Sequence, residues 1–146
     1  MRYELITFGV SGQLFGLDIM AIREIRAWSP VTRLPRVPSY VAGVVNLRGA
    51  VLPVIDLAVR LGWGPTETTP RNPIIVTELD NQSRGLIVHD VNDIVSIAAE
   101  DLQQPDAVSH DEISNYLLGV APLGEEMVMV LDLAKLMVSD ELDLAA

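Results

Sequence analysis

The stretch that decides the fold is GVVNLRGAVLPVIDLAVR, residues 43–60. It returns as GVAPLGEEMVMVLDLAKL in residues 119–136, and at this constant offset of 76 the two segments are identical at 7 of 18 positions. The identical pairs are Gly43/Gly119, Val44/Val120, Leu47/Leu123, Val54/Val130, Asp56/Asp132, Leu57/Leu133 and Ala58/Ala134. Such a repeat predicts a fold built from two related halves, and the cleft between two subdomains is a common place for a binding site.

A second echo lies upstream of the first in both halves, at an offset of 69. Its pairs are Gly16/Gly85, Leu17/Leu86, Ile22/Val91, Glu24/Asp93 and Ile25/Ile94. Each half alone would be near the size at which a core becomes marginal, so we expect the halves to share one core in a single domain over residues 1–146. Its subdomains are expected at about 13–72, crossover strands excepted, and at about 73–138, with a flexible tail at 139–146.

The local pattern is mostly that of short strands joined by turns. Apolar alternation predicts strands at 3–10, 13–17, 22–27, 43–47, 51–55, 74–79, 84–89, 91–97, 117–121 and 127–131. Asp56 and Asp132 each precede a short helical pattern and are expected to cap it. These features predict a mainly β protein, with two small five-stranded antiparallel barrels packed around a shared core and a few short helices.

Charge is divided unevenly along the chain. Residues 1–71 carry eight arginines against five acidic residues, a net of +3, whereas residues 72–146 carry Arg84 and Lys135 against fifteen acidic residues, a net of −13. This distribution suits partners of opposite charge at the two ends of the molecule, although solubility alone would explain it equally well. It does not suit nucleic acid, which requires a dense basic face.

Nothing in the sequence predicts insertion into a membrane or export from the cell. No apolar run approaches the roughly 20 residues of a membrane span. The N-terminal residues enter an alternating segment instead of a signal-peptide core. We therefore expect a cytoplasmic protein with no direct membrane insertion.

The residues that could support catalysis are few. The chain has no cysteine, which excludes disulfides, thiol nucleophiles and cysteine-based zinc sites. The only histidines are His89, at the end of an apolar strand and expected at a barrel rim, and His110, in an acidic loop whose spacing matches no metal-ligand set. Asp56 and Asp132 could form a dyad across the two halves, but capping explains both. We expect no cofactor, no metal and no enzymatic activity, with a carboxylate enzyme using this pair as the alternative.

A binding module remains, and its most pointed feature is the hairpin Asn46-Leu47-Arg48-Gly49. Arg48 has no basic counterpart in the second half, where the hairpin reads Pro122-Leu123-Gly124-Glu125. It is therefore either a solvated turn residue or an exposed fork directed at a carboxylate or carbonyl of a partner. Asn46 and Gly49 are expected to shape the turn that presents it.

A set of short motifs covers nearly the whole chain, from about residue 6 to residue 137. They are Phe15-Gly16-Leu17, Ile22-Arg23-Glu24-Ile25, Thr32-Arg33-Leu34-Pro35, Gly43-Val44-Val45-Asn46-Leu47-Arg48-Gly49, Pro53-Val54-Ile55-Asp56-Leu57, Gly85-Leu86-Ile87-Val88, Val91-Asn92-Asp93-Ile94 and Tyr116-Leu117-Leu118-Gly119. In these motifs the chain closely resembles the CheW family, the adaptors of bacterial chemosensory arrays. The Asn-Leu-Arg-Gly hairpin followed by Pro-Val-Ile-Asp-Leu is a specific signal.

The resemblance implies a fold of two SH3-like barrels and a non-catalytic function. A CheW-like adaptor ties the cytoplasmic tip of a chemoreceptor, a methyl-accepting chemotaxis protein, to the regulatory domain of a CheA-type histidine kinase, and is recruited to membrane receptor arrays. An adaptor of a non-flagellar pathway, such as pilus motility or gene regulation, would look the same.

The resemblance also implies which residues contact partners. Arg48, Glu24 and Ile22 match family positions for receptor or kinase binding, with Asn46 and Gly49 beside Arg48. Core packing is the competing interpretation for Ile22, since Val91 occupies its place in the repeat. A candidate second kinase-facing loop holds Gln103 and Val108.

Overall fold

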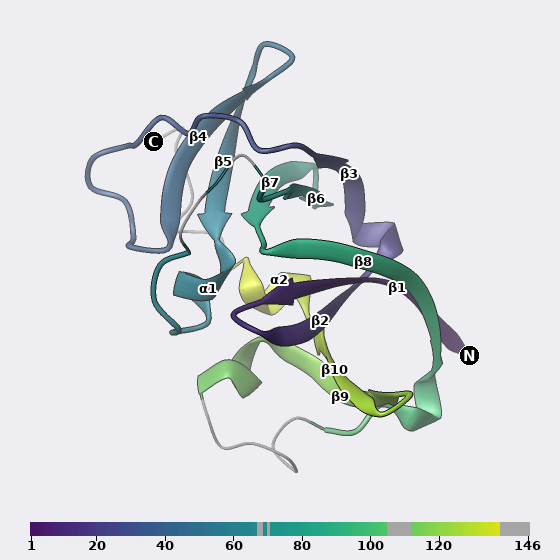
Figure 1. The fold of residues 1–146 in the computed structure, drawn as a ribbon. Coiled ribbons are helices and arrows are strands. Elements are labelled where there is room, and N and C mark those ends of the chain that lie inside the picture. Colours follow the sequence, from purple (N-terminus) through teal and green to yellow (C-terminus); the bar gives the residue numbers. More distant parts are fainter. Residues whose placement is uncertain (67–68, 70, 105–111, 138–146) are drawn as a thin grey trace.

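The computed structural model describes residues 1–66, 69, 71–104 and 112–137, and the chain there is mainly β (Figure 1). The strands are β1 (Arg2–Val10), β2 (Gln13–Asp18), β3 (Ile22–Arg26), β4 (Val41–Leu47), β5 (Ala50–Asp56), β6 (Ile74–Leu79), β7 (Gln82–Ile87), β8 (Asp90–Ala98), β9 (Leu117–Leu123) and β10 (Glu126–Leu131). The helices are α1 (Leu57–Arg60), α2 (Leu133–Leu136) and the 3₁₀ turns η1 (Ile19–Ala21), η2 (Ala99–Asp101) and η4 (Glu112–Tyr116). The strand pattern predicted from the sequence is confirmed, five strands to each half of the chain.

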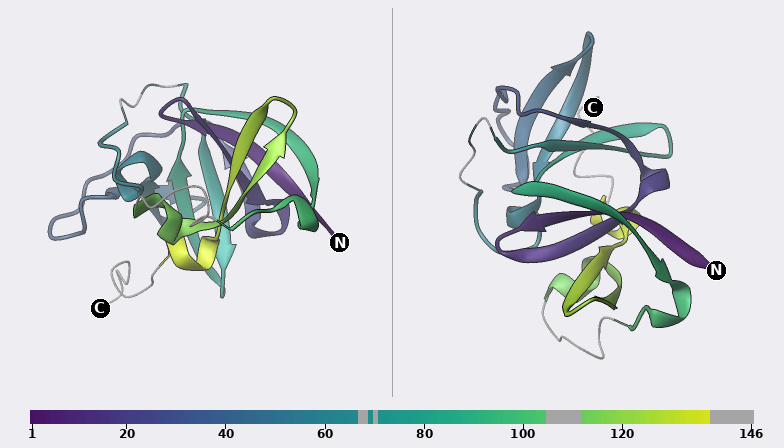
Figure 2. Two further views of the ribbon diagram at one scale, coloured as in Figure 1. Left: turned by 90° about the horizontal axis from the view of Figure 1, so that it is seen from below. Right: turned by 45° about the vertical axis from the view of Figure 1, so that its right-hand side comes forward.

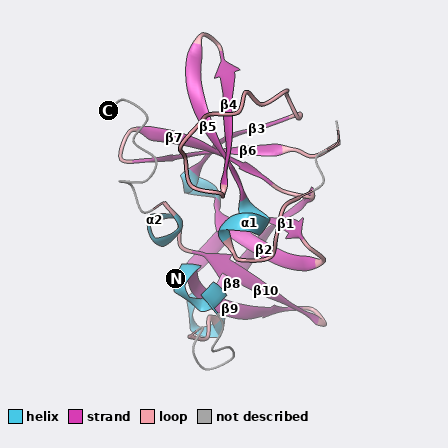
Figure 3. Cartoon of the chain, turned by 90° about the vertical axis from the view of Figure 1, so that its left-hand side faces the viewer, coloured by secondary structure: helices cyan, strands magenta, loops and turns pink. Residues whose placement is uncertain are grey.

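The strands form two five-stranded sheets. Sheet one has the order β8-β1-β2-β10-β9 and sheet two the order β3-β6-β7-β5-β4. In Figure 3 the two sheets lie at opposite ends of the molecule, with α1 and α2 between them. A mainly β protein with two five-stranded subdomains is thus confirmed.

The expected closure of each sheet into a barrel is wrong. Among the described residues, strand pairing joins neither β3 to β4 nor β8 to β9. The edge of β4 is instead satisfied by one loop residue, because Thr32 and Val44 exchange two backbone hydrogen bonds of 2.8 Å. Gln103 does the same for Val120 at the edge of β9. The bridges use the backbone N–H and C=O groups of Val44 and Val120 that would have to pair with another strand if the sheet were closed. Each sheet therefore ends there.

The two halves of the chain exchange strands. Strands β1 and β2 of the first half lie in sheet one, and β6 and β7 of the second half lie in sheet two. Parallel pairing of β2 with β10 and of β5 with β7 joins the halves. The chain crosses between the sheets at η1 and again between β7 and β8 (Figures 1 and 2), so each sheet contains strands from both halves.

The repeat found in the sequence is repeated in the strand register. In sheet two Val54 pairs with Gly85, and in sheet one Val130 pairs with Gly16. Both glycines leave room for facing side chains: a Cβ on Gly85 would lie 2.8 Å from Ile74 Cγ2, and a Cβ on Gly16 would lie 3.1 Å from Leu5 Cδ1. The parallel strand pair in each sheet therefore has the same valine–glycine pairing.

Three apolar clusters stabilise this arrangement. A central cluster lies between the sheets and includes Phe8, Phe15, Ile55, Leu57, Leu86, Leu117 and Leu136. Each sheet also has its own interior cluster, which contains Val54 and Ile74 in sheet two and Leu5 and Val130 in sheet one. Because residues from both halves enter the central cluster, the shared core expected from the sequence is present. No helix in the described part of the chain has the length and apolarity needed to cross a membrane.

Candidate functional site

The tip of the β4–β5 hairpin is a tight two-residue turn. Arg48 and Gly49 have positive φ angles of 49° and 88°, which is the pattern of a type I′ turn. The side-chain Oδ1 of Asn46 accepts a hydrogen bond of 2.7 Å from the backbone N–H of Gly49. Asn46 and Gly49 thus shape the turn, while Arg48 occupies a left-handed conformation that a non-glycine residue adopts at a cost. Ser11, Asp80 and Asn81 in other hairpin turns of the chain also have positive φ, so this conformation belongs to the turn type and it presents the Arg48 side chain at the tip.

The Arg48 side chain reaches back to β3 and pairs with Glu24. Nη2 of Arg48 lies 2.6 Å from Oε1 of Glu24, and Nη1 lies 3.4 Å from Oε2. The two residues are 24 positions apart in the chain, and the pair connects the two end strands of sheet two through side chains alone. It remains accessible, since 62% of the Arg48 side chain and 28% of the Glu24 side chain are exposed.

A bulge in β3 sets the direction of Glu24. The register of β3 against β6 shifts between Ile22, which pairs with Thr77, and Glu24, which pairs with Val76. Bulges of this kind redirect a side chain out of the regular alternation.

The ion pair lies in a basic neighbourhood. The hydrogen bond from Arg48 holds the pKa of Glu24 below its ordinary value, and the charges of Arg48, Arg26 and Arg23 act in the same direction. The same hydrogen bond and the charge of Glu24 raise the pKa of Arg48. Three guanidinium groups around one carboxylate leave a local net charge of +2, which favours an acidic partner surface.

The second half of the chain builds the same corner without an ion pair. There Gly124 stands in the place of Arg48 and Asp93 in the place of Glu24. The bulge in β8 is held instead by Thr7, whose Oγ1 donates to the Asp93 carbonyl at 3.0 Å and accepts from the Asp93 N–H at 3.1 Å. The fold therefore does not require the Glu24–Arg48 pair.

The other residues implied by the family resemblance lie in different settings. Ile22 is half-buried and packs against the central cluster, as its counterpart Val91 does. Gln103 is exposed at the edge of β9 in sheet one, so the structure does not bring it together with the Arg48 hairpin of sheet two. Val108, like His110 and the tail at 139–146, lies outside the described residues.

The carboxylates of the enzymatic alternative are helix caps. Oδ1 of Asp56 accepts from Ala58 N at 3.1 Å, and Oδ1 of Asp132 accepts from Ala134 N at 3.0 Å. Asp56 also binds the connector, accepting from the N–H and the hydroxyl of Thr66 at 2.8 and 2.7 Å. The predicted capping role is confirmed for both residues, and it removes the basis for a catalytic dyad.

His89 is the histidine that lies within the described residues. His89 is exposed, and its backbone N–H donates to the Gly9 carbonyl at 2.8 Å. Within the described ranges no group of three or more potential ligands could hold a metal ion.

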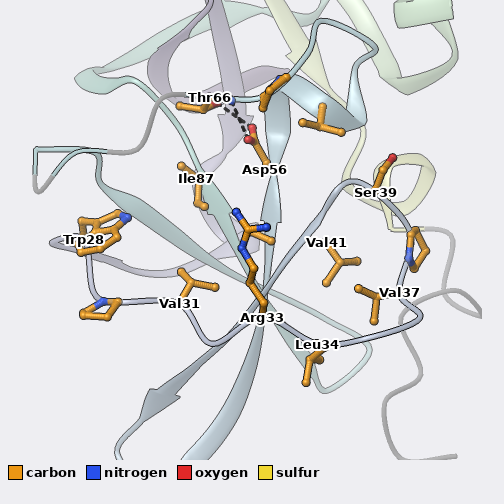
Figure 4. A pocket seen from close by; sticks show the side chains of 15 residues that line it. Trp28, Val31, Arg33, Leu34, Val37, Ser39, Val41, Asp56, Thr66 and Ile87 are labelled. Atoms are coloured by element: carbon orange, nitrogen blue, oxygen red, sulfur yellow. Dashed lines mark hydrogen bonds between the residues drawn. The ribbon is translucent and has the colours of Figure 1, made fainter.

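A pocket that the sequence did not predict lies beside α1. Its volume is about 570 Å³, and it is closed by the loop between β3 and β4, by the start of α1 and by the connector after it (Figure 4). The side chain of Arg33 extends into its centre, and Trp28 lines one wall. The only sequence signal was the Thr32-Arg33-Leu34-Pro35 motif, which carries no indication of a cavity.

Comparison with known proteins agrees with this architecture. The sequence model described as "CheW-like domain" matches residues 4–141. The chain is 40% identical over 142 residues to "Chemotaxis protein CheW" of Rhizobium meliloti, covering 97% of this chain and 92% of the relative. It is 32% identical over 141 residues to the protein of the same name from Klebsiella aerogenes, covering 97% and 85%. The crystal structure of the scaffolding protein TtCheW from Thermoanaerobacter tengcongensis superposes with a TM-score of 0.86 at 29% identity, covering 97% of this chain and 96% of that one.

The two related five-stranded sheets around a common core agree with the matched family model and with the superposed scaffolding protein, and together these place the chain in a class of scaffold proteins. The chain belongs to the CheW-like domain family.

Proposed function

We propose that this protein is a non-catalytic adaptor that couples the cytoplasmic tips of chemoreceptors to the regulatory domain of a CheA-type histidine kinase. Its family membership supports the adaptor class. The single observation that carries the specific proposal is the Glu24–Arg48 ion pair, which is exposed, strained at Arg48 and absent from the equivalent corner of the second half.

The receptor is the partner that we assign to this pair. Side chains of a protein partner that approach the hairpin tip would meet the guanidinium N–H groups of Arg48 that remain free while Glu24 holds the group in place. Because the orientation is set before binding, little further side-chain entropy is lost in the complex. The surrounding Arg23 and Arg26 would speed the approach of an acidic surface and make the association sensitive to salt.

The kinase would use other surfaces of the adaptor. We assign Gln103 and Val108 to a kinase contact; of the two, Gln103 lies at the edge of sheet one, away from the hairpin of sheet two, and Val108 is outside the described residues. Two separate surfaces allow the receptor and the kinase to bind at once. The adaptor then raises their local concentration at a membrane array without catalysing any step.

The decisive experiment measures binding to a receptor-tip fragment and to a kinase regulatory domain, separately and together, at about 0.05 and 0.5 M salt. We expect both partners to bind at once, with the receptor arm weakened by salt. Binding of only one partner at a time would contradict the bridging role.

Variants at the ion pair test its part in receptor binding. Arg48→Ala and Glu24→Ala are each expected to weaken receptor binding by about tenfold or more while leaving the thermal melt unchanged, since exposed pairs contribute little to stability. The exchange Glu24→Arg with Arg48→Glu restores a pair of reversed polarity and tests whether the partner needs the guanidinium at position 48. Lys135→Ala, which removes a positive charge from α2, is the matched control. Wild-type binding by Arg48→Ala would refute the assignment.

A non-flagellar pathway is the second candidate for the function. The cognate receptor alone distinguishes the two, because the same hairpin would serve either array.

A further inference from the structure

We propose that the pocket between the β3–β4 loop and α1 is a binding site for a small apolar monocarboxylate, with the carboxylate held by Arg33 and its body held by the apolar walls. No residue of the Glu24–Arg48 pair lines this pocket, so the inference does not depend on the adaptor proposal. Its volume of about 570 Å³ lies in the range that encloses small-molecule ligands.

The first observation is an unengaged guanidinium in the pocket. Arg33 lines the cavity, and Figure 4 shows its side chain extending between the two walls towards Asp56. Arg33 is exposed. Its side chain makes no hydrogen bond or ion pair with any group of the described chain, as is also true of Arg26, Arg36 and Arg71, but of these four only Arg33 lines the pocket. A guanidinium presents a planar fork of donors that matches a carboxylate in two-point contact.

The second observation is an unsatisfied donor in the same wall. The indole Nε1 of Trp28 is buried and is the single buried side-chain polar atom without a partner in the described part of the chain. Figure 4 shows the nitrogen-bearing edge of the ring turned towards the cavity. A buried N–H without an acceptor costs free energy, which a ligand oxygen reaching it after a small shift of the loop would recover.

The walls define the rest of the ligand. Val31, Leu34, Val37, Val41 and Ile87 line the cavity, so the body of the ligand is aliphatic or aromatic. The loop that carries three of them is pinned to β4 by the Thr32–Val44 bridge, so the wall is supported by the sheet.

Asp56 limits the charge of the ligand. It lies at the back of the pocket with its oxygens already engaged by Ala58 and Thr66, and it makes no ion pair with Arg33. Arg33 and Asp56 together carry no net charge, so a single carboxylate brings the site to −1 whereas a dianion such as phosphate would bring it to −2. Among anions, the charges therefore favour a monocarboxylate.

The test follows the indole N–H signals in a ¹⁵N–¹H NMR titration of the full-length protein. The probes are 3-phenylpropionate and octanoate, with 3-phenylpropionamide as the neutral control, and Trp28→Phe assigns the signal by separating it from that of Trp63. We expect a saturable shift of the Trp28 signal with the carboxylates and binding at least about tenfold weaker with the amide.

Three variants make the outcome decisive. Arg33→Gln should weaken carboxylate binding at least about tenfold and leave amide binding unchanged, whereas Arg71→Gln, which removes an exposed arginine outside the pocket, should bind as wild type does. Arg33→Lys keeps the charge but loses the planar pair of donors, so its affinity for the carboxylates should lie between those of Arg33→Gln and the wild type.

No saturable shift at about 10 mM carboxylate, or equal affinity in Arg33→Gln, would overturn the proposal. A shift produced by an acetyl-Leu-Glu-Leu-amide peptide but not by either carboxylate would overturn it as well, because the pocket would then be a protein-docking surface.

Discussion

Arg60 donates a hydrogen bond of 3.1 Å from Nε to the carbonyl oxygen of Leu136, the residue that occupies Arg60's own place in the second half of the chain. Its guanidinium lies 4.3 Å from the ring centroid of Tyr40 and 4.8 Å from that of Tyr116, and these two tyrosines are also counterparts at the offset of 76. One side chain therefore crosses the axis that relates the halves and contacts matching groups on both sides. It ties α1 to α2 between the sheets.

Replacing Arg60 should weaken the contact between α1 and α2. Arg60→Met keeps most of the length but removes the hydrogen bond and both cation–π contacts, so we expect the free energy of unfolding to fall by about 1–3 kcal/mol. Urea denaturation measures this change in the free energy of unfolding. Arg71→Met is the matched control and should change stability by less than about 0.5 kcal/mol. An unchanged urea midpoint for Arg60→Met would show that the contacts of Arg60 contribute nothing to stability.

The two capping aspartates should differ in what they contribute. Asp132 caps only α2, so Asp132→Ala is expected to lower the free energy of unfolding by about 1 kcal/mol. Asp56 also accepts two hydrogen bonds from Thr66, so Asp56→Ala should cost about 2–4 kcal/mol. Thermal and urea denaturation of both variants check the order. Equal losses would mean that the anchoring of the connector is energetically neutral.

Acid should break the Glu24–Arg48 pair. The folded pKa of Glu24 lies below its ordinary value of 4.5, chiefly because Arg48 donates a hydrogen bond to the ionised carboxylate. The stabilisation from this lowered pKa is present above 4.5 and is lost as the pH falls through the folded value. Titration of the Glu24 carboxyl carbon by NMR should give a midpoint below 4.5 in the wild type and a higher one in Arg48→Ala. Identical midpoints would show that the pair does not persist in solution.

Gly43 should be the least replaceable of the turn and edge glycines. It has a φ of 149°, and a Cβ there would lie 2.1 Å from the carbonyl oxygen of Thr32, inside the bridge that pins the loop to β4. Gly43→Ala is expected to destabilise the fold by at least about 3 kcal/mol. Gly124→Ala is the control, because its φ of 61° imposes only conformational strain of about 1 kcal/mol and nothing lies within 4 Å of its Cβ. Comparable losses would place the cost in backbone conformation instead of the close contact.

Much of the local structure follows from the sequence because it depends on short-range rules. Strand alternation, the two-residue turn at Arg48-Gly49 and the aspartate caps of α1 and α2 each involve residues within a few positions of one another. The shared core also follows, since each half is near the size at which a single core becomes marginal. The repeat was correctly interpreted as two related halves.

The strands that cross between the sheets are not specified by the sequence pattern. The prediction of subdomains at about 13–72 and 73–138 leaves out the crossover strands without naming them, and the fold identifies these strands as β1 and β2, which lie in sheet one, and β6 and β7, which lie in sheet two. An arrangement without the crossover would satisfy the same alternation of apolar residues. Only the parallel pairing of β2 with β10 and of β5 with β7 distinguishes the two arrangements.

The repeated strand pattern, the caps and the turn can be predicted from the sequence because they depend on backbone propensity and hydrophobic period, and the CheW-like motifs can be read there directly. The tertiary structure alone decided that Arg48 meets Glu24, that Arg60 meets Leu136 and that Arg33 enters a pocket beside Trp28. Each of these arises where segments distant in the chain pack together, and a local pattern does not specify which distant side chains will share a contact. The candidate site could thus be predicted as a list of residues, while its geometry required the fold.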